Sequence, residues 1–201
     1  MDPADRLALL VLGMHRSGTS ALTRIVNLLG AELGENLLPA HPDNETGFWE
    51  HRDVVVLHDE LLAALGTSWD DPRPIAEEDL RGPIAEPYRD RLRELLVRDF
   101  ETAPCFAIKD PRLCRLLPLW LPLLEELKVR TACILVGRHP DEVAASLDRR
   151  NEVADANARL LWLGHVLSSE WHSRHLPRAF VTFDGLLRDW RAEMRRVGQA
   201  L

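Results

Sequence analysis

The segment Gly13–Ser20, with the sequence GMHRSGTS, has the residue types and spacing most suggestive of chemistry. It follows the apolar run Leu7–Leu12, which predicts a buried strand, and precedes a helical pattern that starts at Thr19. Glycines let such a loop curl so that backbone N–H groups converge, and a helix N-terminus adds partial positive charge. The segment predicts an anion site; an ordinary glycine-containing turn is the alternative.

The loop matches the nucleotide-binding pattern G-x-x-x-x-G-K-[ST] except that Thr19 stands in the place of the lysine. NTPases use that lysine on the β- and γ-phosphates and the next hydroxyl on Mg²⁺. The cation within this loop is instead Arg16. A sulfuryl group carries less negative charge than a phosphoryl group, so an arginine, hydroxyls and backbone N–H groups can hold it, and no metal is expected.

The elements that must position this loop alternate along the chain. We expect strands at Leu7–Leu12, Cys105–Ile108, Thr131–Val136 and Ala179–Phe183, and helices from Thr19 and at Asp53–Leu65, Glu86–Glu101, Asp141–Arg149, Glu152–His172 and Gly185–Gly198. This order predicts an α/β class: a single domain over residues 1–201, P-loop-like and three-layered, with a central parallel sheet of four or five strands and helices on both faces.

Two segments interrupt the alternation and are expected to be loops. They are Leu38–Glu50, which contains Pro42, and Gly66–Pro87. Trp49 and Trp69 fall in these loops and are expected to line a pocket. Apolar residues on the longest helical pattern are instead predicted to be core: Leu160, Trp162, Leu163, Leu167 and Trp171.

Ligands of parallel sheets bind beyond the carboxyl ends of the strands. Lys109 and Arg138 follow two of the predicted strands, and Lys109 is one of two lysines among 25 basic residues. Other polar residues near this edge are Arg112, Arg115, His139, Arg149, Arg150 and Asp184.

Three motifs in this order resemble sulfotransferases that use 3'-phosphoadenosine 5'-phosphosulfate (PAPS), particularly the bacterial and tyrosylprotein-type branches. His15–Ser20 is similar to their 5'-phosphosulfate loop, and Ile108-Lys109-Asp110-Pro111 resembles their Lys-Asp-Pro segment. Arg138, followed eight residues later by Ser146, resembles their 3'-phosphate pair. The resemblance covers roughly residues 7–190. Family members commonly continue past the last strand, so the domain is expected to be short at its C-terminal end.

The resemblance implies an enzyme that moves the sulfuryl group of PAPS to a hydroxyl or amine and releases the product PAP. It implies that Arg16 acts on the transferring group and Lys109 on the bridging oxygen. An ion pair of Lys109 with Asp110 or another nearby acid is the alternative. The residues implied to bind the nucleotide are Gly13, His15, Arg16, Ser17, Gly18, Thr19, Ser20, Arg138 and Ser146.

The base that takes the acceptor proton is less well defined. Sulfotransferases use a glutamate or a histidine downstream of the loop. Glu50 follows Phe48 and Trp49, which can desolvate it and raise its pKa. Its neighbour His51 and the earlier Glu35 are rivals, and a helix N-terminal role for Glu50 is the alternative.

Composition excludes several classes of function. A net charge of −7 argues against non-specific binding of nucleic acid. No apolar run reaches the length of a membrane span, and the acidic segment 1–6 does not resemble a signal peptide, so a cytoplasmic location is expected. The three cysteines match no metal pattern. The acceptor is left open among small molecules, carbohydrates, lipids and peptides, as is the oligomeric state.

Two alternatives to a sulfotransferase are kept. One is a P-loop kinase or another NTP-using transferase, for which Asp110 and Asp184 are the candidate Mg²⁺ ligands. The other is a non-enzymatic module that binds PAP or another nucleotide.

Overall fold

The apolar run Leu7–Leu12 forms the strand β1 near the centre of a parallel sheet. The structure is a computed structural model that describes residues 6–41 and 44–201, so segment 1–5 and Pro42 lie outside the described residues. β1 pairs with β2 on one side and β3 on the other, and β3 pairs with β4. The other strands are β2 (Cys105–Lys109), β3 (Arg130–Gly137) and β4 (Arg178–Thr182), and the order is β2-β1-β3-β4.

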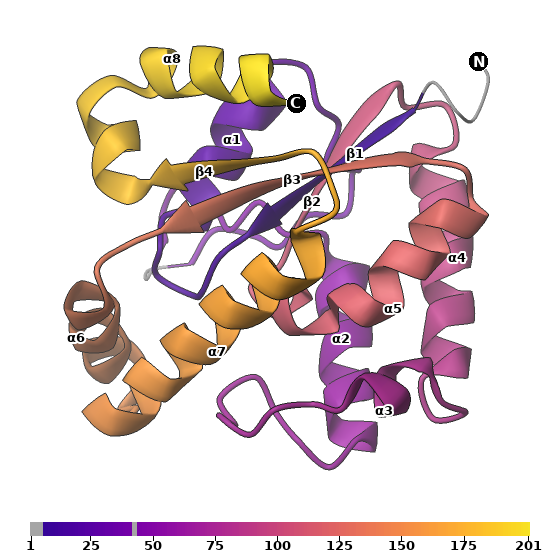
Figure 1. Ribbon diagram of the computed structural model, residues 1–201, viewed down its shortest axis with the longest axis horizontal. Coiled ribbons are helices and arrows are strands. Elements are labelled where there is room, and N and C mark those ends of the chain that lie inside the picture. The colour runs from indigo at the N-terminus through magenta and orange to yellow at the C-terminus, as the bar shows by residue number, and fades with distance from the viewer. Residues whose placement is uncertain (1–5, 42–43) are drawn as a thin grey trace.

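Eight helices of the described residues connect and cover these strands (Figure 1). They are α1 (Thr19–Leu28), α2 (Arg52–Ala64), α3 (Glu77–Arg81), α4 (Glu86–Phe100), α5 (Leu113–Glu126), α6 (Pro140–Asn151), α7 (Asp155–Ser173) and α8 (Phe183–Ala200).

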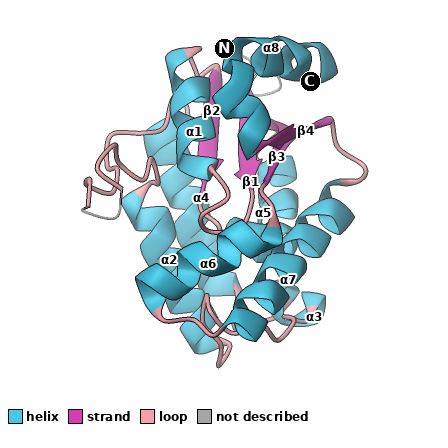
Figure 2. Cartoon of the chain, turned by 90° about the vertical axis from the view of Figure 1, so that its left-hand side faces the viewer, coloured by secondary structure: helices cyan, strands magenta, loops and turns pink. Residues whose placement is uncertain are grey.

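The sheet is buried on both faces because its strands present apolar side chains in both directions. Ala8, Leu10 and Leu12 belong to a core shared with α2, α4 and α5, whereas Val11 belongs to a core shared with α1 and α8. Figure 2 shows α6 at the near end of the molecule, beyond the carboxyl ends of the strands. The predicted three-layer α/β class is confirmed, with four strands in the described residues.

Two helices were not predicted. α5 contains Pro118 and Pro122 in its interior, where each proline removes a backbone hydrogen bond. The helix forms because nearly all of its apolar side chains are buried between the sheet and the helices α4 and α7. The short helix α3 lies within the predicted loop Gly66–Pro87.

The prediction that the apolar side of α7 is core is wrong for four of its five residues. Leu160, Leu163, Leu167 and Trp171 are 44–60% exposed, and Trp162 is half-buried. The buried side consists of Ala158, Leu161, His165, Ser169 and Ser173. Small side chains let α7 pack against α5. Backbone carbonyls of α7 are partners for two of the buried polar groups, since His165 Nδ1 lies 2.7 Å from the Leu161 oxygen and Ser173 Oγ donates to the Ser169 carbonyl at 2.6 Å.

Candidate functional site

The loop between β1 and α1 has the backbone conformation that an anion cradle requires. Arg16 and Gly18 have positive φ angles of 68° and 90°. A side chain at Gly18 would also place its Cβ 2.3 Å from Cδ2 of Phe183, so steric space and φ both demand glycine. No side chain caps the N-terminus of α1, which leaves its first N–H groups without a side-chain acceptor, the arrangement found at anion sites.

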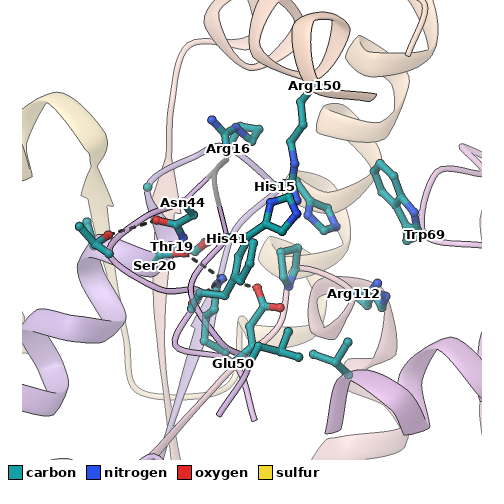
Figure 3. Close-up of a pocket in the computed structure, with 18 of the residues that line it drawn as sticks. His15, Arg16, Thr19, Ser20, His41, Asn44, Glu50, Trp69, Arg112 and Arg150 are labelled. Carbon is teal, nitrogen blue, oxygen red and sulfur yellow. Dashed lines mark hydrogen bonds and ion pairs between the residues drawn. The ribbon is translucent and has the colours of Figure 1, made fainter. Parts of the chain in front are cut away.

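A cavity of about 570 Å³ opens over this loop, a volume in the usual range for small-molecule sites (Figure 3). It brings together residues from the loop Gly13–Ser20, the segments before and after α2, the end of β2 and the start of α5. The segment after β3, helix α6 and the start of α8 contribute the others. Those that carry the argument are His15, Arg16, Thr19, Ser20, Phe48, Glu50, Trp69, Lys109, Arg112, Arg138, Arg150 and Phe183.

Glu50 and Lys109 form a buried ion pair in the wall of this cavity. The Lys109 ammonium also donates to the Phe48 carbonyl at 3.1 Å and to Ser20 Oγ at 3.2 Å. Burial raises the pKa of Glu50, and the charge of Lys109 opposes this without cancelling it. A carboxylate with a raised pKa is suited to accept a proton from a group bound beside Gly13–Ser20, called the anion loop below for its predicted ligand.

Asp110, the expected alternative partner of Lys109, is fully buried and engaged elsewhere. His58 Nδ1 lies 2.8 Å from Asp110 Oδ2, while His58 Nε2 accepts a hydrogen bond from Trp120 at 2.8 Å. This arrangement makes Nδ1 the protonated nitrogen that donates to the carboxylate. Arg112 donates to Asp110 Oδ1 at 2.9 Å. The network fixes Asp110, which follows Lys109 in the chain, and Arg112, which lines the cavity.

The predicted pair Arg138 and Ser146 lies on either side of Arg16. Arg16 Nε donates to Ser146 Oγ at 2.8 Å, and Arg138 Nη1 donates to the Arg16 carbonyl at 3.1 Å. Arg138 also pairs with Glu142 at 2.6 Å and lies 4.6 Å from the centre of the Phe183 ring. Arg138 lines the cavity, whereas Ser146 is buried and is connected to the cavity through its hydrogen bond with Arg16.

His15, from the same loop as Arg16, also lines the cavity. Its ring lies 4.7 Å from that of Trp69, which confirms that Trp69 lines the pocket. Burial, with the charge of Arg112, lowers the pKa of His15 well below its usual value, so its ring is neutral at pH 7. Its Nε2 is buried with no hydrogen-bond partner among the described residues.

The two rivals of Glu50 lie away from the cavity. Glu35 lines a separate groove that also includes Asp53 and Asp99. His51 precedes α2 and directs Nε2 toward Asp99 at 3.0 Å. Burial lowers the pKa of His51, and Asp99 opposes that change. Of the three candidate bases, Glu50 is the one that lines the cavity in the described part of the chain.

Some lining residues were missed by sequence reasoning. Asn44 donates to the Gly47 carbonyl at 2.6 Å and to Ser20 Oγ at 3.3 Å, which ties the Leu38–Glu50 loop to the anion loop. Phe183 and Asn151 also line the cavity, but no motif marks them. Trp49, expected in the pocket, instead packs with the α1 side of the core, and Arg24 lies over its ring at 4.4 Å.

Comparison with known proteins does not place the chain in a family. A scan against protein-family models finds no match, and a search of the curated proteins finds none either. Among residues 6–41 and 44–201, no helix combines the length and the apolar composition needed to cross a membrane.

Proposed function

We propose that this chain is a sulfotransferase that moves the sulfuryl group of PAPS to a hydroxyl or amine acceptor and releases PAP. The observation that carries the proposal is the convergence of Glu50 and Lys109 on the anion loop. These residues are far apart in sequence, yet they form a buried pair within hydrogen-bond reach of Ser20.

The loop accounts for binding of the phosphosulfate. The uncapped N-terminus of α1 and the hydroxyls of Thr19 and Ser20 provide donors for its oxygens. Arg16 supplies positive charge to a loop whose usual lysine position is occupied by Thr19. Arg138 lines the same cavity and is the candidate for the 3'-phosphate, since a guanidinium offers two parallel donors to phosphate oxygens.

The proposed transfer is a substitution at sulfur and needs no oxidant or reductant. The acceptor oxygen or nitrogen attacks the sulfur atom as its proton passes to Glu50. The bond between sulfur and the bridging oxygen of the 5'-phosphate breaks, and that oxygen carries the leaving electron pair. Lys109 can then turn from Glu50, once that carboxylate is protonated, and stabilise the charge on the leaving oxygen. The buried pair therefore couples loss of the acceptor proton to release of PAP.

The kinase alternative has less support. It requires a carboxylate that can reach a metal beside the phosphates. Asp110 is held by His58 and Arg112, and Asp184 does not line the cavity among the described residues.

A thermal-shift experiment separates these functions. PAP or PAPS is expected to raise Tm without added metal, by an amount that grows with ligand concentration, and ATP with Mg²⁺ should do much less. Equal or stronger stabilisation by ATP with Mg²⁺ would contradict the proposal. Labelled PAPS offered with hydroxyl and amine acceptors then tests turnover. Binding of PAP with no transfer to any acceptor class would favour a non-enzymatic module.

A further inference from the structure

A second cluster of polar groups lies behind Glu50, outside the cavity. His51 and Asp53 stand at the start of α2, and Asp99 lies near the end of α4. One ligand atom from each of these three residues lies within 4.8 Å of the others. One imidazole and two carboxylates from two helices are thus directed toward a common point.

His51 is the part of the cluster that a purely acidic surface patch would lack. Its side chain is 2% exposed. It packs against Gly34, where an added Cβ would lie 2.8 Å from the ring, and its ring centre is 6.1 Å from that of Phe100. Nε2 points to Asp99, yet neither ring nitrogen makes a hydrogen bond of acceptable geometry with the described residues. Nε2 is therefore held 3.0 Å from a carboxylate oxygen of Asp99 without a well-aligned hydrogen bond, a separation that a shared metal ion would also span.

The cluster already attracts a cation. The Arg98 guanidinium lies 2.8 Å from Asp53 Oδ2 and 2.7 Å from Asp99 Oδ2. Its side chain is 59% exposed, so it can swing into solvent and leave both carboxylates available. The printed hydrogen bonds of Arg98 go to the two carboxylates, whereas a metal ion would coordinate the imidazole nitrogen of His51 as well.

We propose that His51, Asp53 and Asp99 bind a divalent transition-metal ion of the Zn²⁺ or Co²⁺ type. Mixed imidazole and carboxylate ligands suit these ions, whereas Mg²⁺ prefers oxygen ligands alone. Tetrahedral ligands of zinc lie about 3.4 Å apart, so small rotations of the two carboxylates complete the geometry. Asn36 Nδ2 donates to Asp53 Oδ1 at 2.8 Å and orients that ligand.

The surroundings leave room for the rest of the coordination sphere. A groove of about 790 Å³, lined also by Glu32 and Glu35, opens over Asp53 and Asp99 and admits water to the remaining positions. The metal would join the first turn of α2 to the last turn of α4. Its expected effect is therefore on stability, and it is independent of the proposed sulfuryl transfer.

Titration of the metal-free protein with Co²⁺ tests the site through the visible absorption of the ion, and calorimetry with Zn²⁺ gives the affinity. Asp53→Asn and Asp99→Asn should each weaken Zn²⁺ binding by at least about tenfold, as expected for loss of a ligand. His51→Ala should do the same where it folds. Arg98→Gln should tighten binding because it removes the competing cation. The matched control is Glu35→Gln, which alters the same groove and should bind like the wild type.

Three outcomes would overturn the proposal. Equal binding of Mg²⁺ and Zn²⁺ would show that the groove attracts counterions without a role for His51. Unchanged affinity in both aspartate variants would place the metal elsewhere. Loss of affinity in Arg98→Gln would show that the guanidinium does not occupy the metal's position.

Discussion

The ammonium of Lys109 and the carboxylate of Glu50 form a buried ion pair at the carboxyl end of β2, with side chains that are 2% and 8% exposed. Burial of such a pair has a large desolvation cost, and an apolar pair of similar volume is often as stable. The pair also contacts the anion loop through Ser20, 3.2 Å from the Lys109 ammonium. Its position therefore fits a catalytic role better than a purely structural one.

Glu50→Gln tests the role of this pair in proton transfer. We expect kcat for sulfuryl transfer to fall by about 10²–10⁴-fold, the usual contribution of a general base. PAP affinity should change little because the glutamine keeps the volume and still accepts a hydrogen bond from Lys109. Glu35→Gln is the control and should have a mild effect, since Glu35 lies outside the cavity. The opposite ranking of the two variants would move the base to Glu35.

Arg138→Ala is expected to weaken PAP by about 2–4 kcal/mol, the range for removal of one partner of a hydrogen-bonded charge pair. Affinity for adenosine 5'-phosphosulfate, which lacks the 3'-phosphate, should barely change. Glu142→Gln is the matched control because it removes the acid that competes for Arg138, and PAP should bind at least as tightly. Ser146→Ala should weaken both nucleotides, because Ser146 orients Arg16. Calorimetry with both ligands gives the comparison, and equal losses in Arg138→Ala would assign that residue to the fold.

Asp110 predicts a specific dependence of stability on pH. Burial alone would raise its pKa, but the charge of Arg112 and the hydrogen bond from His58 hold the pKa well below its usual value. The native state keeps Asp110 ionised, whereas the unfolded chain takes up a proton below about pH 4. This stabilisation is therefore present above about pH 4 and is lost as the pH falls further.

Urea unfolding at a series of pH values measures that contribution. Asp110→Asn should lower the free energy of unfolding at pH 7 by about 3–5 kcal/mol, as for other broken buried pairs. The difference from the wild type should shrink below pH 4. Asp79→Asn is the control, because Asp79 is an exposed helix N-terminal acid outside the network. Parallel profiles of wild type and Asp110→Asn would show that Asp110 does not stabilise the fold through its charge.

The register of α7 predicts opposite outcomes for two neighbouring leucines. Leu161 is 1% exposed, so Leu161→Ala should lower the free energy of unfolding by about 2–5 kcal/mol through cavity formation. Leu163 is 44% exposed, and Leu163→Ala should change it by less than about 0.5 kcal/mol. Chemical denaturation of both variants checks the ranking. A large loss in Leu163→Ala alone would mean that this side of α7 is covered in solution.

The sequence by itself determined the α/β class and the location of the loop Gly13–Ser20, for which we propose anion binding. Both depend on local patterns: the apolar run Leu7–Leu12, the glycines of Gly13–Ser20 and the helical period that follows. A strand, a tight turn and a helix are specified within about 20 residues, so nearby residues are sufficient. The same reasoning marked Lys109 and Arg138, because parallel strands end at one edge of the sheet.

Tertiary structure decided which of these side chains meet. Glu50 and Glu35 could not be ranked from sequence, because the choice depends on how the Leu38–Glu50 loop folds back onto the anion loop through Asn44. The exposed side of α7 was equally hidden, since helical periodicity gives the spacing of apolar residues but not the face that neighbours cover. Long-range packing fixes both, and it arises from contacts between segments far apart in the chain.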